Sequence, residues 1–562
     1  MLVLEEERFN REKHTLAFPL HALIAAFGDK AADLASVDLI TTPWDEMRLR
    51  RSFGRAIAAR LPMSLSLLLQ RSHTPQRNEI VRVSAVLRRR LNRLTEGRFR
   101  LPPIINVGHH ESHAAAFFVS PFDEASILVM DGFGDDAAST VYTGRDNRIE
   151  RQWHEPMFNS IGLVYTFLTQ FLGFGGFSDE GKVMALAACG DDSYVERFRD
   201  VIRLEPDGRY RINLDYFDYP TYGELRPFKP RFFEVFGPPR KPGVLLEDRH
   251  LAIAHALQVV TEETIVHVVR ALEKKFKSRN LVLTGGVALN CVANARILEQ
   301  TGMERIWVPP CASDTGAPLG SALWHYHQTL GKARSYELRH AFLGLEYSDD
   351  EIARELEKAG LNSEVLDEHS LHNRIARDLA NGKIVGVFHG RFESGPRALG
   401  NRSILADPRR AEIKTVINSK IKHREPFRPF APAVLEEHAG DYFEISQPDP
   451  FMTLAPMANE HKAGLIQAAI HVDGTARIQT VSAVDNPNFY KIIKAFQNIT
   501  GVPVLLNTSF NRHEPIVARP DHAISCYLRT GMDALAIGRH YVSERPAAAV
   551  SRAKSKFRPG PI

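Results

Sequence analysis

Hydrophobic residues in the first part of the chain gather in short runs and in helically spaced sets. Ile127–Met130 is a short apolar run closed by an Asp-Gly pair, which predicts a strand that ends in a turn. Residues 253–276 carry apolar side chains at helical spacing, and Leu281–Leu283 then predicts a strand that enters the turn Thr284–Gly286. Helix, strand, glycine turn and helix in this order are typical of an α/β fold.

The same alternation returns later in the chain. Residues 349–359 predict a helix, with Ser348 or Asp349 as its cap. Ile384–Phe388 and Val502–Leu506 predict two β-branched strands, and each of them leads into a polar segment. The second half is therefore also expected to be α/β.

The length of the chain and its C-terminal end set the expected domains. Because 562 residues exceed one ordinary core, we expect two α/β domains, at residues 1–336 and 343–546. Residues 547–562 are rich in Lys, Arg and Pro, which predicts a disordered basic tail.

Composition narrows the class of protein. Hydrophobic residues make up 44% and charged residues 25%, as in ordinary globular chains, and the net charge of +4 gives no reason to expect a nucleic-acid partner. No apolar run approaches the roughly 18 residues of a membrane span, so no membrane partner is expected. The charged N-terminus lacks the apolar core of a signal peptide. The four cysteines form no Cys-x-x-Cys pair and suit a reducing cytoplasm, where we expect the protein to lie.

Residues 45–98 differ from their surroundings in composition. They hold thirteen arginines and only four acidic residues. One interpretation is a basic cap that attracts an anionic partner. The favoured interpretation is a solvated helical insertion whose arginine stems cover apolar residues.

The first chemical signal is the run His109–His113. Its first and last histidines are four residues apart, so on a helix they share one face and can bind one divalent metal ion. Asp131 and Asp314 each sit in a glycine turn, where they are either turn formers and caps or two further ligands. A site of two imidazoles and two carboxylates suits Fe(II), Mn(II) or Zn(II) better than calcium.

Glycine turns and arginine-rich segments form a second signal. The turn Thr284–Asn290 follows a strand and precedes a helix, where backbone N–H groups favour anions. Arginine forks can hold phosphate through two bonds, and several follow predicted strand ends, where α/β folds bind ligands. The alternative is a solvated basic face. The polar segments are residues 390–403, 420–430, 473–479 and 507–511.

Taken together, these segments resemble the carbamoyltransferase family that includes nodulation-factor and antibiotic O-carbamoyltransferases, from about Glu5 to Tyr541. The resemblance implies an actin-like N-terminal domain, similar to the tRNA threonylcarbamoyl-transfer protein, and a C-terminal α/β domain similar to threonylcarbamoyl-adenylate synthase. It implies that carbamoyl phosphate and ATP form carbamoyl-AMP, with Mg²⁺ accompanying ATP. A hydroxyl of a small-molecule acceptor then takes the carbamoyl group.

The same resemblance implies roles for individual residues. Fe²⁺ is the expected metal, with ligands His109, His113, Asp131 and Asp314. His110 is expected to act as a base or to orient the substrate, and Lys420 and Arg397 are expected to act in catalysis. Contacts to the adenylate are implied for Gly285, Gly286 and Asn290. Contacts to carbamoyl phosphate and ATP are implied for Arg391, Arg397, Arg424, Arg428, Arg477, Asn507 and Ser509.

The beginning of the chain departs from the family pattern. Members usually carry a glycine-turn strand well before the Glu-Glu-Arg-Phe segment, which here is Glu6–Phe9. The resemblance therefore implies that the first strand and most of the second are missing.

Two other functions stay open. One is tRNA threonylcarbamoylation, because both halves have relatives there, although those activities usually sit on separate chains. The other is an actin-like ATP-binding regulator without transfer chemistry. Acceptor identity is open between sugar, lipo-oligosaccharide and antibiotic-like scaffolds, and a homodimer is also open.

Overall fold

The computed structural model of the protein describes residues 1–64 and 75–556. Two compact units are present. We call Leu23–Leu338 the front unit, and we call Met1–Ala22 together with Arg339–Ile562 the back unit. Each unit contains helices and a central sheet, so the fold is mixed α/β, as the sequence predicts.

The front unit is built on a five-stranded sheet. Its central strand β3 pairs antiparallel with β4 and parallel with β8. The predicted strands at 127–130 and 281–283 lie within β3 and β8 and are confirmed. In sheet order the strands are β5 (Arg148–Pro156), β4 (Ala137–Arg145), β3 (Glu124–Met130), β8 (Asn280–Thr284) and β9 (Arg305–Trp307).

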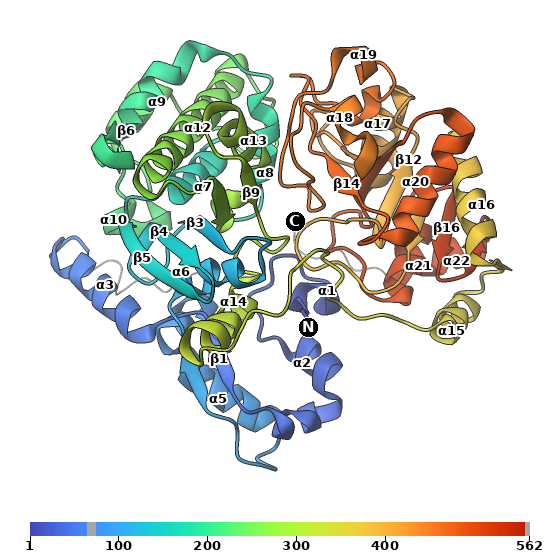
Figure 1. The fold of residues 1–562 in the computed structure, drawn as a ribbon, viewed down its shortest axis with the longest axis horizontal. Helices are drawn as coiled ribbons and strands as arrows, with labels where there is room; N and C mark the ends of the chain where they lie inside the picture. The colour runs from blue at the N-terminus through green and yellow to red at the C-terminus, as the bar shows by residue number, and fades with distance from the viewer. Residues whose placement is uncertain (65–74, 557–562) are drawn as a thin grey trace. The chain divides into compact units, whose positions relative to one another are not determined.

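Helices of the front unit follow the predicted order around β8. The predicted helix at 253–276 is the second part of α12, which spans Asp248–Phe276. After β8 the chain makes the short turn η7 (Gly286–Leu289) and enters α13 (Cys291–Gln300). Figure 1 shows these elements in green. Other helices of this unit are α7 (Ile161–Phe171), α8 (Glu180–Ala187), α9 (Val195–Val201) and α11 (Pro230–Phe236).

A small parallel pair leads into the histidine run. Strand β1 (Ile40–Thr42) pairs with β2 (Ile104–Asn106), and α6 (His109–Ala114) begins three residues after β2. Helix α14 (Ala317–Leu323) packs against α6. A Cβ atom on its Gly320 would lie 1.8 Å from the carbonyl oxygen of Ser112, so only glycine permits this close approach.

The basic segment is helical where it is described. It forms α3 (Glu46–Ala58), the 3₁₀ turn η2 (Pro75–Arg82) and α5 (Val83–Leu94). Residues 65–74 lie outside the described residues. Across the described chain, no helix combines the length and the apolar character that crossing a membrane requires.

The back unit is built on an eight-stranded mixed sheet. The predicted strands at 384–388 and 502–506 correspond to β11 and β15 and are confirmed, although β15 starts two residues later. In sheet order the strands are β10 (Glu364–Val365), β17 (His540–Val542), β16 (Ala534–Ile537), β11 (Val385–Phe388), β12 (Arg402–Ala406), β15 (Val504–Ser509), β13 (Ala431–Leu435) and β14 (Gln479–Val481).

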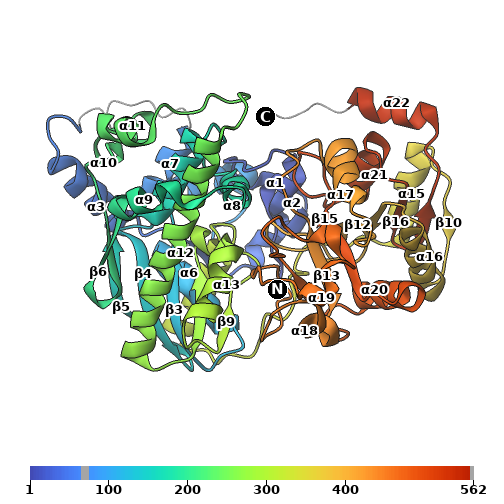
Figure 2. The same cartoon turned by 90° about the horizontal axis from the view of Figure 1, so that it is seen from above.

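Both faces of this sheet are buried. Successive strand residues point to opposite faces, and Leu505 accordingly packs with α16 (Glu368–Ala380) and α20 (Pro487–Thr500), whereas Leu506 packs with α15 (Asp349–Ala359) and α21 (Pro520–Arg529). Figure 2 shows these helices around the strands. The helix predicted at 349–359 has those bounds, and Ser348 is its cap.

The N-terminal segment differs from its expected place. We predicted residues 1–336 as one domain, but Met1–Ala22, with α1 (Glu6–Asn10), belongs to the back unit. The reason is that two arginines of this segment bond to carbonyl oxygens of the back unit. Arg8 is only 1% exposed and donates to the Gly395 carbonyl oxygen, and Arg11 donates to those of Pro515 and Ile516.

The C-terminal tail also differs from the prediction in its first ten residues. They form α22 (Ala547–Lys556), which packs against α21. Its apolar Ala549 is buried there, and this burial stabilises a segment that its composition alone predicts to be disordered. Residues 557–562 lie outside the described residues.

Candidate metal centre and anion site

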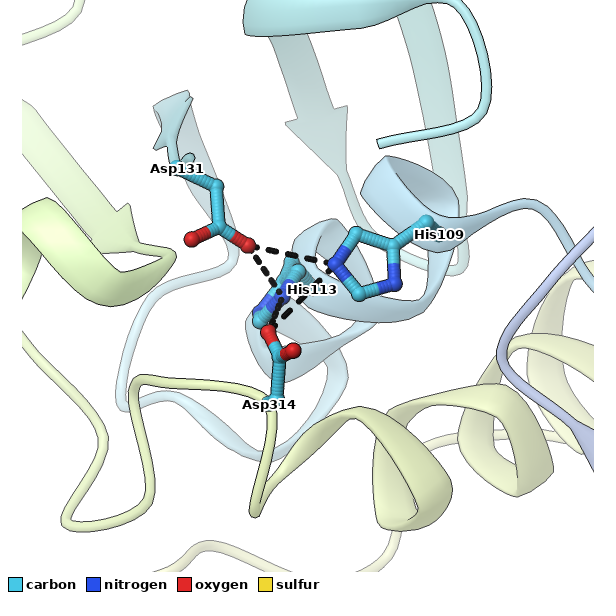
Figure 3. A group of neighbouring side chains, drawn as sticks. All are labelled: His109, His113, Asp131 and Asp314. Carbon is cyan, nitrogen blue, oxygen red and sulfur yellow. Dashed lines mark hydrogen bonds and ion pairs between the residues drawn. The ribbon is translucent and has the colours of Figure 1, made fainter. Parts of the chain in front are cut away.

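Four side chains of the front unit converge (Figure 3). Each offers one ligand atom, and these atoms all lie within 4.8 Å of one another. Nε2 of His109 lies 3.1 Å from Asp131 Oδ2 and 3.4 Å from Asp314 Oδ1. Nε2 of His113 lies 3.3 and 3.5 Å from the same two oxygens. The four residues predicted as metal ligands are therefore neighbours in space.

Local structure explains this convergence. His109 and His113 are one turn apart on α6, so their rings face the same side. Asp131 follows β3 directly, and Asp314 lies in the turn before α14. Both imidazoles are 1% exposed, whereas the Asp314 side chain is 68% exposed, so the cluster opens to solvent at that residue.

Electrostatics bind the four groups together. Burial alone lowers the pKa of His109, but the carboxylates of Asp314 and Asp131 outweigh it and raise that pKa well above its usual range. Burial alone raises the pKa of Asp131, but the two imidazoles outweigh it and hold that pKa well below its usual range.

The donor set fits a divalent metal ion. Nε2 of His113 is buried and makes no well-aligned hydrogen bond within the described part of the chain, so its lone pair has no other use there. Metal–ligand bonds of about 2.0–2.2 Å place ligand atoms about 3 to 4 Å apart, which matches the four histidine–aspartate distances. Two imidazoles and two carboxylates suit Fe(II), Mn(II) or Zn(II).

Asp131 also connects the cluster to the glycine turn after β8. Its Oδ1 accepts the backbone N–H of Gly132 at 2.8 Å and that of Gly286 at 3.2 Å. Gly285 has φ +91°, and a Cβ atom there would lie 2.2 Å from the Met130 carbonyl oxygen. The turn predicted to hold an adenylate therefore lies directly beside the four converging side chains.

Two other residues of the front unit that were predicted as site residues form hydrogen bonds with protein groups. Nδ1 of His110 lies 2.7 Å from the Thr140 hydroxyl, while its Nε2 is buried and has no hydrogen-bond partner among the described residues. Asn290 caps α13 by accepting the N–H of Ala293, and its amide exchanges hydrogen bonds with Gln258. Asn290 therefore shapes the site from within the core.

In the back unit a buried lysine lies at the end of β15. Lys422 is 2% exposed, and its ammonium donates to Ser509 Oγ at 3.1 Å and to Asn511 Oδ1 at 2.8 Å. Ser509 Oγ in turn donates to Asn511 Oδ1 at 2.7 Å. Burial lowers the pKa of Lys422 well below its usual range, and the charge of Arg424 lowers it further.

Arg424 and Arg428 lie near this lysine. Burial and then the charges of Arg428 and Arg477 lower the pKa of Arg424 to about 9. Its guanidinium donates from Nε to Asn418 Oδ1 at 2.8 Å and lies over the Phe430 ring. Because like charges gathered in a low-dielectric site repel each other, an anion bound here would relieve the repulsion.

Two other residues predicted to contact carbamoyl phosphate and ATP are bonded to protein groups, and a third is half-buried in a loop. Arg391 donates to the carbonyl oxygens of Met1, Leu343 and Gly344, so it clamps backbone. Asn507 is 1% exposed and donates to the Ala398 carbonyl oxygen and to Gln479 Oε1. Arg397 is half-buried in the loop before β12.

The sequence reasoning did not single out Lys422 or Asn511. It chose Lys420, which the structure leaves exposed. The π-helical turn η9 (Ile417–Lys422) decides between the two lysines, because it turns Lys422 and Ile421 inward. No sequence signal for a π turn was available, although Asn511 stands two residues after the predicted Ser509.

Comparison with known proteins identifies the family of the chain. The model of the family described as "Carbamoyltransferase N-terminus" matches residues 1–323, and that of "Carbamoyltransferase C-terminus" matches residues 376–544. Nodulation protein NolNO of Sinorhizobium fredii is 36% identical over 97% of this chain and 77% of its own length. Nodulation protein NolO of Bradyrhizobium diazoefficiens is 38% identical over 79% of this chain and 80% of its own.

The name of a third relative describes a reaction. It is 3'-hydroxymethylcephem-O-carbamoyltransferase of Amycolatopsis lactamdurans, 32% identical over 72% of this chain and 73% of its own. Among solved structures, HypF of T. kodakarensis is 15% identical with a TM-score of 0.23, covering 45% of this chain and 39% of its own. A likeness at that level supports no structural argument.

Proposed function

Because the chain belongs to the carbamoyltransferase family and is an enzyme that transfers carbamoyl groups, we propose that it is an ATP-dependent O-carbamoyltransferase. It makes carbamoyl-AMP from carbamoyl phosphate and ATP, and it then carbamoylates a hydroxyl of a small-molecule acceptor. The observation that supports this most directly is the cluster of four ligand atoms within 4.8 Å of one another, beside a glycine turn.

The first step is assigned to the back unit. Water hydrolyses carbamoyl phosphate to carbamate and inorganic phosphate, a carbamate oxygen attacks the α-phosphorus of ATP, and pyrophosphate leaves. The buried ammonium of Lys422 and the guanidinium of Arg424 supply positive charge for these anions. Arg428 and Arg477 belong to the same set, because their charges act on Arg424.

The second step is assigned to the front unit. The acceptor hydroxyl oxygen attacks the carbamoyl carbon, the bond to AMP breaks, and the hydroxyl proton leaves. A divalent ion held by the two histidines and two aspartates would stabilise negative charge on the departing phosphate. The turn at Gly285 and Gly286 lies beside these ligands, because the Gly286 N–H donates to Asp131 Oδ1 at 3.2 Å. His110, whose Nε2 has no hydrogen-bond partner among the described residues, is the candidate to receive the proton.

The two steps can be tested separately. Pyrophosphate release that depends on carbamoyl phosphate reports the first step, and an acceptor mass gain of one carbamoyl group reports the second. His113→Ala should abolish the mass gain and leave pyrophosphate release within about 2-fold. Arg424→Ala should lower pyrophosphate release by about 10- to 100-fold, as expected for loss of a contact worth about 1.5–3 kcal/mol.

Three outcomes would overturn the proposal. Pyrophosphate release blocked by His113→Ala with transfer spared would reverse the assignment of the steps. ATP binding without any dependence on carbamoyl phosphate would favour the regulator. Carbamoyl or threonylcarbamoyl groups found on tRNA rather than on a small molecule would favour the tRNA-modifying alternative.

A further inference from the structure

The ring of His109 is held from the side opposite the other three side chains of the candidate metal site. Its Nδ1 lies 3.1 Å from the Pro43 carbonyl oxygen, and its Nε2 faces the cluster. The indole of Trp44 stacks on the same ring, with centroids 4.0 Å apart and planes inclined by 22°. Two consecutive residues therefore control both the tilt of the imidazole and the position of its proton.

A buried carboxylate holds the backbone at His109 and the backbone of the segment that carries Pro43 and Trp44. Asp135 is 2% exposed, and its two oxygens accept the N–H of His109 at 2.8 Å and the N–H of Asp45 at 3.0 Å. This carboxylate therefore joins the first residue of α6 to the residue that caps α3.

Strand pairing brings the two segments together. In the β1–β2 pair, Thr42 stands opposite Asn106, and the Val107 N–H donates to the Thr42 carbonyl oxygen at 2.9 Å. The segments that follow β1 and β2 therefore leave the strand pair side by side. One turn further, Arg48 of α3 donates to Glu111 of α6 at 2.7 Å. The segment Pro43–Arg48 is thus anchored to α6 at several points.

We propose that Pro43, Trp44 and Asp135 are positioning residues that hold His109 with its proton on Nδ1 and its Nε2 lone pair aimed at the metal ion. A ligand histidine whose other nitrogen donates to a carbonyl has a fixed tautomer and ring plane, and loss of such support weakens metal binding about 10- to 100-fold. The inference rests on the metal site of the proposed function, and it concerns ion binding rather than the reaction.

Trp44 makes the inference measurable without any turnover. Co²⁺, titrated into the metal-free full-length protein, should quench indole fluorescence because Trp44 stacks on a ligand ring. Trp44→Phe should keep the ring contact, so Co²⁺ affinity measured by calorimetry should stay within about 3-fold while most of the quenching is lost. Trp153→Phe is the matched control, since Trp153 stacks on Phe276 instead, and it should keep the quenching.

Two further variants remove the support itself. Trp44→Ala and Asp135→Asn should weaken Co²⁺ binding about 10- to 100-fold and alter the visible absorption of the bound Co²⁺. Wild-type affinity in both folded variants would overturn the inference, as would the absence of Co²⁺ binding by the wild-type protein. Co²⁺ binding with the expected variant pattern but no carbamoyl transfer would instead refute the proposed function alone.

Discussion

Lys420 and Lys422 are two residues apart, yet their surroundings are opposite. Lys420 is exposed, whereas the ammonium of Lys422 is buried against Ser509 and Asn511. A buried ammonium with polar neighbours can neutralise a bound phosphate, while an exposed one gains little from it. At the scale of single residues, depth of burial separates a candidate catalytic lysine from a surface one.

This contrast gives the first prediction. Lys422→Ala should lower carbamoyl phosphate-dependent pyrophosphate release by about 10- to 100-fold, because a charged contact worth about 1.5–3 kcal/mol is lost. Lys420→Ala is the matched control and should stay within about 2-fold. Equal effects of the two substitutions on the release rate would contradict the assignment.

Asp449 gives a prediction about pH. It is buried, and burial raises its pKa to about 6 even though it accepts N–H bonds from Phe451, Thr453 and Leu454. Since this pKa exceeds the unfolded value of 3.8, the folded state binds the proton more tightly, and stability falls as pH rises through about 6. Between pH 5 and 7.5 the wild type should therefore lose about 1 to 1.5 kcal/mol relative to Asp449→Asn in urea unfolding. Parallel pH profiles of the two proteins would show that Asp449 does not titrate in this way.

At the scale of elements, the ends of the strands determine where the polar groups of the front unit lie. β3 and β8 run parallel, so Asp131 and the turn at Gly285 emerge at the same edge of the sheet. The N–H of Gly286 then reaches Asp131 Oδ1. Any change that lifts this turn should disturb the metal ligands as well.

Gly285→Ala tests this coupling. Its Cβ would meet the Met130 carbonyl oxygen at 2.2 Å, so the turn must shift, and we expect a loss of about 3 kcal/mol in unfolding free energy together with weaker Co²⁺ binding. Gly243→Ala is the matched control, because Gly243 also has positive φ (+80°) but no atom within 4 Å of an added Cβ. It should cost only about 1 kcal/mol and leave Co²⁺ affinity unchanged. Unchanged Co²⁺ affinity in folded Gly285→Ala would refute the coupling.

At the scale of the whole molecule, the beginning of the chain completes the unit formed by its end. Arg8 bonds Glu5 at 2.6 Å and the Gly395 carbonyl oxygen, and the Gly395 N–H donates to the other oxygen of Glu5. Gly395 belongs to the loop that carries Arg397 toward β12. The N-terminal segment therefore supports the loop that carries Arg397, which lies almost 400 residues later.

Arg8→Ala should destabilise the back unit by about 3–5 kcal/mol, because it removes a buried guanidinium and leaves the Glu5 carboxylate, which is 10% exposed, without its cationic partner. Calorimetry should show a lowered transition for this unit, while Co²⁺ binding by the front unit stays unchanged. Lys13→Ala, at an exposed position of the same segment, is the control and should leave the transition in place. A uniform loss in both units would contradict this assignment.

The sequence by itself determined the periodic elements and the four side chains that converge in the front unit. The spacing of His109 and His113 and the turns at Asp131 and Asp314 were readable, because helical phase and strand ends are local properties. The structure alone decided which of the two lysines, Lys420 or Lys422, is buried. At about 100° per residue, a regular helix puts Lys420 about 60° from Ile417 and Lys422 about 140° away. The π turn reverses this order, because packing of the back-unit core, and not local pattern, selects that turn.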